Sequence, residues 1–312
     1  MVKYFDFERD IQKIDDLLDS LDKFNSDNSS KINQLQLERT HKLKSLYSRL
    51  EPWQKVQVSR HNDRPHSIDY INNIFGNIIY LHGDKKFADD SAIIGGFAKI
   101  ENQSIIFIGT EKGNTMDTRL KHNFGMAKPE GYRKSQRLIA LAEKFNLPVV
   151  TLVDTAGAFP GKDAEERGQS ESIASSILSF LRVMTPTLSV IIGEGGSGGA
   201  IGIATSDKVL MLEHSTYSVI SPEGCASILW RSTNFSQEAA NTLKLTSEDC
   251  KKFEIIDDII PEIPGGAHRN HLEQSKIVKE FLLDNIEKLK SFPIEDLIKR
   301  RKKKYLNITS DI

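Results

Sequence analysis

The stretch that decides the fold is IIGEGGSGGAIG, residues 191–202. The β-forming run 188–192 leads into it, five glycines fall within residues 193–199, and small apolar residues follow. This order predicts a strand, a glycine turn and a helix that begins at the turn. Such a turn directs several backbone N–H groups at one point, where the helix dipole also favours negative charge. The stretch therefore predicts a place where an anion is bound or where negative charge develops during a reaction.

Known motifs overlap in this stretch and disagree. Gly193-x-Gly195-x-x-Gly198 has the spacing of a dinucleotide fingerprint. Glu213 follows at about the 20 residues that this fingerprint requires. However, the strand-like run 209–212 begins too soon for a mononucleotide-binding unit of about 30 residues. A dinucleotide site is therefore disfavoured.

The sequence of the turn is compatible with two chemical hypotheses and one structural hypothesis. Gly195-x-Ser197-x-Gly199 spells a nucleophile elbow, with Ser197 as the nucleophile of a hydrolase. Acids and histidines follow in a suitable order: Asp207, Glu213, His214, His268 and His271. The second reading needs no side chain, because paired backbone N–H groups form an oxyanion hole. The structural alternative is a tight turn in which glycine lets a helix and a strand pack closely.

Length and composition indicate a globular protein of one large or two ordinary domains. The chain has 312 residues, of which 38% are hydrophobic and 27% charged, and its formal charge is −1. This charge gives no global attraction to nucleic acid or to an anionic membrane surface. The apolar runs are too short for a transmembrane helix, and the start MVKYFDFERD lacks a signal-peptide core. The two cysteines, Cys225 and Cys250, lie in no metal-binding pattern, so we expect a cytoplasmic protein without zinc.

Helical patterns are expected at both ends of the chain. Apolar residues recur at helical spacing over 5–24 and 32–50, with the polar run 25–30 between them. These two helices are predicted to form an arm that packs on the core or on a partner chain. Residues 271–312 are predicted to be helical again.

Short strand and helix patterns alternate in the middle of the chain, which is typical of a largely parallel α/β core. A helix is predicted over 129–145, with Pro129 in its first turn. Asp163 and Glu166 have the spacing of a capping box for the next helix, which runs to Met184. The expected strands are 92–100 and 104–108 as neighbours, then 149–153, 188–192, 209–212 and 216–220.

A second informative loop, DTAGAFPG at 154–161, follows the predicted strand 149–153. Ligands of parallel sheets bind beyond the carboxyl ends of the strands, so this loop and the glycine turn are expected to face one crevice. Gly157-x-x-x-Gly161-Lys162 resembles a P-loop but is one residue short and lacks the Ser or Thr that holds magnesium. We therefore expect no nucleotide hydrolysis by this chain. For Asp154, the role of a hydrogen-bonding turn residue is favoured over a chemical role.

Basic residues form three further candidates. The run 299–304 is interpreted as the solvated end of a helix rather than a nucleic-acid site. The basic residues of 128–137 surround a helix start and suit either solvation or a phosphate-bearing ligand. His268-Arg269, after Gly265-Gly266, fits an anion site or an ordered loop equally well.

Several long motifs identify a family. Together, the sequence resembles the carboxyltransferase alpha subunit of bacterial acetyl-CoA carboxylase from about residue 50 to 270, and matches it more loosely elsewhere. The stretches that carry the resemblance are PWQKVQVSRHNDRPHSIDYI (52–71), FGMAKPEGYRKSQR (124–137), DTAGAFPG (154–161), IGEGGSGGAIGI (192–203), STYSVISPEGCASILW (215–230) and IPGGAHRN (263–270).

The resemblance implies a fold and a domain division. The family has the crotonase-like α/β fold, a spiral of ββα units with its active site at a subunit interface. Here this implies a helical arm over 1–50, a carboxyltransferase core over 51–270 and C-terminal helices over 271–312.

The resemblance also implies a reaction and partners. The family transfers a carboxyl group from carboxybiotin, carried on the biotin carboxyl carrier protein, to acetyl-CoA, giving malonyl-CoA for fatty acid synthesis. The alpha subunit supplies the biotin side, while the beta subunit supplies the acetyl-CoA side and a zinc ribbon, in an alpha2beta2 heterotetramer. ATP is consumed by the separate biotin carboxylase. No metal in this chain, no membrane and no nucleic acid are therefore expected.

Site residues follow from the resemblance and from the glycine turn together. The backbone amides of Gly198 and Gly199 are expected to form the oxyanion hole for biotin. Gly195 and Gly196 are expected to allow the cofactor to approach closely. The pocket for biotin is expected to be lined by Gly157, Ala158, Phe159 and Pro160. No side-chain nucleophile is expected, because the ureido nitrogen of biotin can itself take the acetyl proton.

Overall fold

The computed structural model describes residues 4–21, 28–308 and 310. It divides into two compact units, Met1–Leu50 with Ile263–Gly266, and Glu51–Glu262 with Ala267–Ile312. None of the described helices combines the length and the apolar character needed to cross a membrane.

The first unit contains the helical arm. A single turn, η1 (Asp6–Glu8), leads into α1 (Arg9–Ser20), which packs against α2 (Ser29–Tyr47). The Tyr47 hydroxyl donates a 2.9 Å hydrogen bond to Glu8, which is buried. Two predicted helices are thus confirmed, although the second begins inside the polar run 25–30. Phe24 and residues 25–27 lie outside the described residues.

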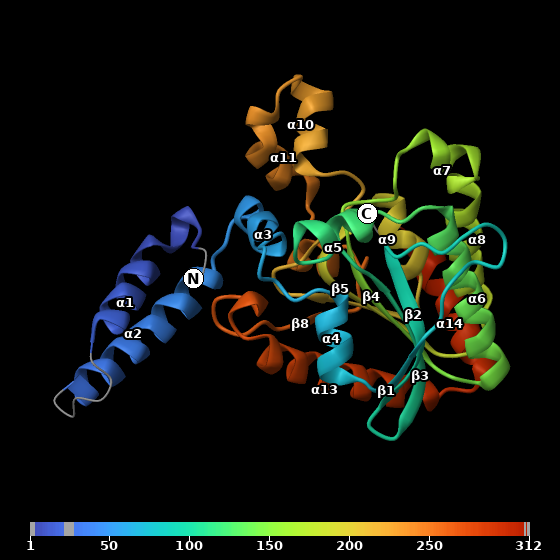
Figure 1. Ribbon diagram of the computed structural model, residues 1–312, viewed down its shortest axis with the longest axis horizontal. Coiled ribbons are helices and arrows are strands. Elements are labelled where there is room, and N and C mark those ends of the chain that lie inside the picture. The colour runs from blue at the N-terminus through green and yellow to red at the C-terminus, as the bar shows by residue number, and fades with distance from the viewer. Residues whose placement is uncertain (1–3, 22–27, 309, 311–312) are drawn as a thin grey trace. The chain divides into compact units, whose positions relative to one another are not determined.

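The second unit is built on one sheet of eight strands (Figure 1). The strand order is β1-β2-β3-β4-β5-β6-β8, with β7 paired to β5. Pairing is antiparallel from β1 to β3 and parallel in every other pair, which confirms the expected largely parallel core. The strands are β1 (Gly76–Tyr80), β2 (Ile93–Ile100), β3 (Gln103–Thr110), β4 (Val149–Thr155), β5 (Thr187–Gly196), β6 (Lys208–Leu212), β7 (Thr216–Ser218) and β8 (Asp258–Ile260).

Helices cover both faces of the sheet. Successive residues of a strand point to opposite faces, and β4 shows this directly. Val150 packs in one buried cluster with α4 and α13, whereas Val149 packs in the other with α6, α8 and α9. The helices are α3 (Pro52–Ser59), α4 (Ser67–Ile74), α5 (Met116–Lys121), α6 (Pro129–Phe145), α7 (Lys162–Glu166), α8 (Gln169–Arg182), α9 (Ser197–Ala204), α10 (Pro222–Trp230), α11 (Ser236–Leu243), α12 (Ser247–Lys252), α13 (His271–Lys290) and α14 (Ile294–Asn307).

Two local predictions were wrong. The expected capping box does not form, because Gly161 is the N-cap of the short α7 and Asp163 lies inside that helix. Gly168, with a left-handed φ of +81°, then interrupts the helical conformation before α8 begins. The single helix that was predicted is therefore two helices, α7 and α8. The predicted strand 216–220 ends at Ser218, whose hydroxyl donates to the Ile220 carbonyl as the chain turns towards α10.

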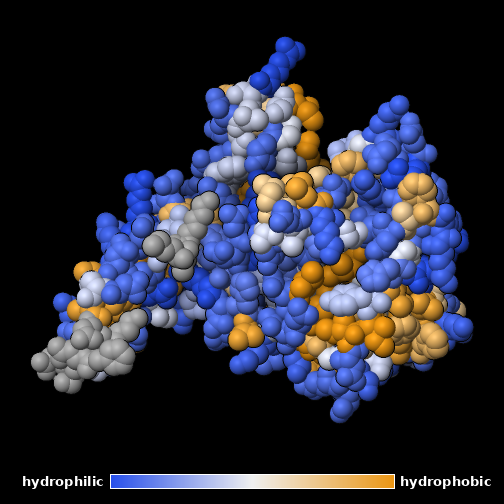
Figure 2. Space-filling model, in the orientation of Figure 1, coloured by the Kyte–Doolittle hydropathy of each residue, from blue (hydrophilic) through white to orange (hydrophobic). Residues whose placement is uncertain are grey.

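A lobe formed by α10 and α11 stands off the sheet and packs on α3 (Figure 1). Large apolar side chains on and before α10 are exposed, among them Val219 at 74% and Ile228 at 72%. Hydrophobic atoms are visible on one flank of this lobe (Figure 2). Exposed apolar clusters of this kind commonly mark contacts with other molecules.

Candidate functional site

The glycine turn begins as part of the sheet. The predicted strand 188–192 extends as β5 to Gly196, and its last three residues pair with β7. Helix α9 then starts at Ser197, which adopts a left-handed φ of +51°. The predicted order of strand, turn and helix is therefore confirmed, with the strand one residue longer at its start and four residues longer at its end than expected.

The first turn of α9 presents backbone amides. The first four N–H groups of an α-helix have no acceptor within the helix. Gly196 is the N-cap and has no side chain that could accept from them. Gly198 is half-buried and Gly199 is buried. Together, the dipole and these amides favour negative charge at this end of α9.

The two predicted loops lie against each other. A Cβ placed on Gly196 would stand 2.2 Å from the Ala156 carbonyl oxygen, and one on Gly199 would stand 2.5 Å from the Gly157 carbonyl carbon. Both distances are far below ordinary contact, so glycine is required for the backbones to approach. The expected meeting of the loops at the ends of β4 and β5 is confirmed.

Most glycines of the turn are thus required by the protein's own packing. A Cβ on Gly195 would stand 2.7 Å from the Tyr217 ring. On Gly193 it would stand 2.3 Å from the Asp154 carboxylate. Gly198 is different, because its nearest neighbours would be Ile173 methyl groups at 3.7 and 3.8 Å, an ordinary contact. Packing alone does not explain glycine at this position.

The loop after β4 is held in place by its neighbours. The Phe159 amide donates to the Ala127 carbonyl, and the Gln169 side-chain amide donates to the carbonyls of both residues. Lys128 lies 4.9 Å above the Phe159 ring. Gly157 adopts a φ of +150°, while Ala158 is half-buried and Pro160 is exposed.

Asp154 is the residue that ties the two loops to the rest of the core. Its Oδ1 accepts hydrogen bonds from the Glu194 amide at 2.9 Å and from Lys112 Nζ at 2.7 Å, and its Oδ2 accepts one from His66 Nδ1 at 3.0 Å. Burial alone would raise the pKa of this carboxyl group. The Lys112 charge and the His66 hydrogen bond outweigh burial and hold the pKa well below its usual range. Asp154 therefore does more than shape a turn, because its bonds reach three other segments.

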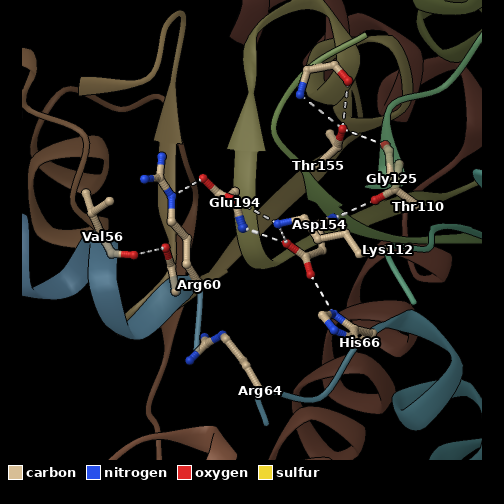
Figure 3. A network of polar contacts seen from close by, with 12 residues as sticks. Val56, Arg60, Arg64, His66, Thr110, Lys112, Gly125, Asp154, Thr155 and Glu194 are labelled. Carbon is tan, nitrogen blue, oxygen red and sulfur yellow. Dashed lines mark hydrogen bonds and ion pairs between the residues drawn. The ribbon is translucent and has the colours of Figure 1, made fainter. Parts of the chain in front are cut away.

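A chain of ion pairs continues from Asp154 (Figure 3). Lys112 also forms an ion pair with Glu194 at 2.7 Å. Arg60 forms ion pairs with both Glu194 and Glu223, which lies at the start of α10. Burial favours a lower pKa for Lys112 and a higher one for Glu194. The opposite charges prevail, so the pKa of Lys112 is raised and that of Glu194 is lowered. Both groups are held in their charged forms.

This network was not predicted from the sequence. Its members lie on separate segments, and only two signals pointed to them. Glu194 is the single charge within the glycine turn, and Arg60 and His66 fall within the family stretch 52–71.

Two neighbouring cavities open beside the turn. The larger has a volume of about 240 Å³, and the smaller, of about 30 Å³, reaches Gly195 and Gly196. Both are lined by Arg60, Ala156 and Glu194, so they adjoin. The larger is also lined by Ser59, His61, Asn62, His66, Lys112, Arg119 and Phe124.

The alternative readings of the turn gain little from the structure. Helix α9 has eight residues, which agrees with a connection too short for a dinucleotide unit. Among the described hydrogen bonds, none joins Ser197 to a histidine. Asp207, the first candidate acid of a hydrolase, is buried in an ion pair with Arg301 at 2.6 Å.

Two of the three basic candidates serve the fold. In the segment 128–137, Lys134 is buried and donates a hydrogen bond to the Asp90 carbonyl, and Arg133 donates one to the Asp84 carboxylate. The run 299–304 is not wholly solvated, contrary to expectation. Its Arg301 is buried and donates to the carbonyls at the end of α8, and Lys304 pairs with Asp257.

Comparison with known proteins identifies the family. Residues 4–309 match the family described as acetyl co-enzyme A carboxylase carboxyltransferase-like. The chain belongs to this family. It is 47% identical over 311 residues to the acetyl-coenzyme A carboxylase carboxyl transferase subunit alpha of Rhodopseudomonas palustris, covering 99% of this chain and 97% of that one. Its identity to the protein of the same name from Zymomonas mobilis is 50%, covering 99% of both chains.

Solved structures share the fold at low identity. A chain of a Pseudomonas malonate decarboxylase hetero-tetramer in complex with coenzyme A aligns with a TM-score of 0.59 and 11% identity, over 75% of this chain and 91% of that one. The beta subunit of geranyl-CoA carboxylase from P. aeruginosa aligns with a TM-score of 0.57 and 16% identity, over 78% of this chain but only 46% of that one. The expected crotonase-type α/β fold is confirmed.

Proposed function

We propose that this chain is the subunit that provides the biotin side of an acetyl-CoA carboxylase carboxyltransferase. It helps to move a carboxyl group from carboxybiotin on a carrier protein to acetyl-CoA, giving malonyl-CoA. The observation that carries the proposal is the first turn of α9, in a chain of this family. No side chain caps its amides. Gly198 is the one glycine of the turn at which close packing does not explain the absence of a side chain.

Backbone amides suit this chemistry. The ureido oxygen of biotin gains negative charge when the carboxyl group leaves the ring nitrogen. The amides of Gly198 and Gly199 are proposed to donate to that oxygen. They need no rearrangement to do so, because α9 and the Asp154 network fix them in advance. Gly195, Gly196 and Gly157–Pro160 are proposed to line the place where the ring binds.

The assembly is proposed from the same family relationship. Partners are a carboxyltransferase beta chain in an alpha2beta2 heterotetramer, the biotin carboxyl carrier protein, and a biotin carboxylase that uses ATP. Exposed apolar side chains around α10, such as Ile228 and Leu229 at 72% and 61%, support contact with another chain. A cytoplasmic location is part of the same proposal.

Reconstitution tests the proposal directly. The chain is co-expressed with a beta chain of the same family, and transfer is assayed in reverse, as acetyl-CoA formed from malonyl-CoA and free biotin. We expect transfer by the complex and none by either chain alone, because each holds part of the site. Transfer by this chain alone would contradict a shared site, and an inactive, correctly assembled complex would contradict the proposed reaction.

A further inference from the structure

Phe124 lies in a turn whose backbone conformation its side chain disfavours. The three successive residues Asn123, Phe124 and Gly125 have left-handed φ angles of +47°, +55° and +77°. Glycine adopts this conformation freely and asparagine tolerates it, whereas for a bulky residue it is an outlier. Residues held in such conformations cluster at functional sites, where the surrounding structure fixes them.

Hydrogen bonds within the turn fix this conformation. The Met126 amide donates to the Asn123 carbonyl at 2.9 Å, and the Asn123 side-chain amide donates to the Met126 carbonyl at 2.7 Å. The Gly125 amide donates to the His122 carbonyl at 2.9 Å. The backbone of Phe124 is therefore held in its strained conformation by its neighbours on both sides.

The same turn is bound to the loop after β4, which is proposed to hold biotin. Near the start of that loop, the Thr155 hydroxyl donates to the Gly125 carbonyl at 2.7 Å (Figure 3). Near its end, the Phe159 amide donates to the Ala127 carbonyl at 2.9 Å. Phe124 therefore belongs to a segment that is attached to both ends of the loop.

The Phe124 ring forms part of the wall of the cavity beside the glycine turn. This cavity, of about 240 Å³, adjoins the smaller one at Gly195 and Gly196. Phe124 and Ala156 are the apolar residues of its lining, and the other lining residues are polar or charged. Phe124 is also 41% exposed, so a molecule bound in the cavity can bury part of its ring.

The lining cations of the cavity have their partners within the chain. Arg60 and Lys112 are each paired with two carboxylates. Arg119 donates to the Gly113 carbonyl and to the Asn62 side chain. Little of their charge is left for the phosphates of coenzyme A. The bicyclic ring of biotin suits this lining better, because it is uncharged and has a polar ureido edge and an apolar, sulfur-containing side.

We propose that Phe124 is a biotin-contact residue, whose ring supplies the apolar wall against which the bicyclic ring of biotin packs. The inference rests on the proposed function. The left-handed turn holds the phenyl ring at the cavity, and the hydrogen bonds to the loop after β4 fix its position relative to that loop. Contact between the two rings buries apolar surface on both, so it contributes to the affinity for biotin. Phe124 brings no polar group to the transfer step, so it acts on binding rather than on kcat.

The test measures biotin affinity in the reconstituted complex. We expect Phe124→Ala to raise the KM for free biotin about 10-fold in the reverse reaction, the low end of the effect of removing an apolar contact from a binding pocket. The kcat and the KM for malonyl-CoA should change little. A ligand-detected NMR titration without malonyl-CoA should show biotin binding weakened by the same factor. Phe124→Tyr keeps the ring and should retain a KM near that of wild type.

Leu120→Ala is the matched control. Leu120 is 63% exposed near the end of α5, four residues before Phe124, and does not line the cavity. Its variant should keep the wild-type KM for biotin. If Leu120→Ala weakens biotin binding as much as Phe124→Ala does, the exposed apolar side chains act as a docking face rather than as a wall of the cavity, and the inference is overturned.

The strain of the turn has its own measurement. Phe124→Ala and Phe124→Gly both lack the ring, but only glycine relieves the left-handed backbone. The unfolding midpoint of Phe124→Gly should therefore lie about 2–4 °C above that of Phe124→Ala, while both variants lose the same biotin affinity. A midpoint of Phe124→Gly at or below that of Phe124→Ala overturns the strain on which the inference depends. If Phe124→Ala fails to fold, Phe124→Gly supplies the affinity measurement.

Binding and positioning roles give different results. A folded Phe124→Ala variant that keeps the wild-type KM for biotin overturns the inference. A rise in the KM for malonyl-CoA alone also overturns it, because the ring would then contact the acyl-CoA. A fall in kcat with unchanged biotin affinity overturns it as well, because Phe124 would then only position the loop. An inactive wild-type complex that assembles correctly instead overturns the proposed function, and this inference with it.

Discussion

Replacing Asp154 by asparagine tests whether its charge holds the two loops together. All three partners of Asp154 act as donors: the Glu194 amide, Lys112 and His66 Nδ1. Asparagine has one acceptor oxygen, so its amide group must face one of these donors. The lower-energy choice turns the amide group towards His66, whose ring can move its proton from Nδ1 to Nε2. Lys112 then loses one of its two buried carboxylates.

The size of the effect follows from these contacts. A hydrogen bond to a charged group contributes about 1.5–3 kcal/mol, and removing one partner of a fully buried ion pair costs about 3–5 kcal/mol. Lys112 keeps Glu194 at 2.7 Å, so the loss is smaller than for an isolated pair. We expect Asp154→Asn to lower the free energy of unfolding by about 2–4 kcal/mol, with a fall in the unfolding midpoint of about 5–10 °C for a unit of this size.

The pH dependence separates charge from shape. The pKa of Asp154 is lower in the folded chain than in the unfolded one, where it is about 3.9. Its contribution is therefore fully present above the unfolded value and is lost as the pH falls through the folded value. The difference in unfolding free energy between wild type and Asp154→Asn should be constant from about pH 5 to 8 and should narrow below about pH 4.

Thermal unfolding of the purified chain measures both effects. Asp163→Asn is the matched control, because it removes a carboxylate from α7, the helix that follows the loop, and this side chain is 49% exposed; its midpoint should stay at the wild-type value. An Asp154→Asn midpoint equal to that of wild type at pH 7 would refute the claim that this carboxylate ties the loops. If the difference in unfolding free energy between wild type and Asp154→Asn does not narrow in acid, the loss of stability comes from packing rather than from charge.

The glycine turn, its serine and the buried Arg301 each offer a direct test. Gly198→Ala should fold normally, because the added methyl group would have no neighbour closer than 3.7 Å. It should lower the rate of carboxyl transfer by about 10²-fold, because the methyl group crowds the backbone amide. An unchanged transfer rate would show that this amide does not take part in the reaction. Gly199→Ala should lower the free energy of unfolding by about 1–3 kcal/mol, as measured in urea, because its methyl group would lie 2.5 Å from a backbone carbon. Ser197→Ala should keep most transfer activity in the reconstituted complex, whereas complete loss would favour the hydrolase reading. Arg301→Leu should cost about 3–5 kcal/mol in the same urea experiment by leaving a buried carboxylate unpaired, whereas Lys299→Leu, which is exposed, should leave stability unchanged.

Signals between near neighbours in the sequence predicted much of the fold. The helix predicted over 129–145 is α6 with the same bounds, because proline in the first turn and a regular apolar face define it. The neighbouring strands predicted at 92–100 and 104–108 are β2 and β3, paired through a two-residue turn. The break between α7 and α8 was missed because the left-handed conformation of Gly168 has no signature beyond glycine itself.

The ion-pair network could not be predicted from sequence spacing. Its bonds join residues far apart in the chain, Lys112 to Glu194 over 82 positions and His66 to Asp154 over 88. The separate pair of Arg301 with Asp207 spans 94 positions. Each pairing depends on the order of strands in the sheet, which periodicity does not specify. The run 299–304 shows the consequence, since its composition suggests a solvated helix end while the fold buries Arg301 beneath α8.

Most glycines of the turn give weaker support for a ligand site than the sequence suggested, whereas Gly198 gives stronger support. At four of the five glycines, a side chain would collide with the chain itself, at Gly196 with the Ala156 oxygen only 2.2 Å away. Those four would be required whether or not anything binds. Gly198 has room for a methyl group and is still glycine, half-buried at the amide end of α9. Neither packing nor a left-handed φ requires glycine there. The proposed approach of biotin would account for it, and Gly198→Ala is the substitution that tests this proposal without disturbing the fold.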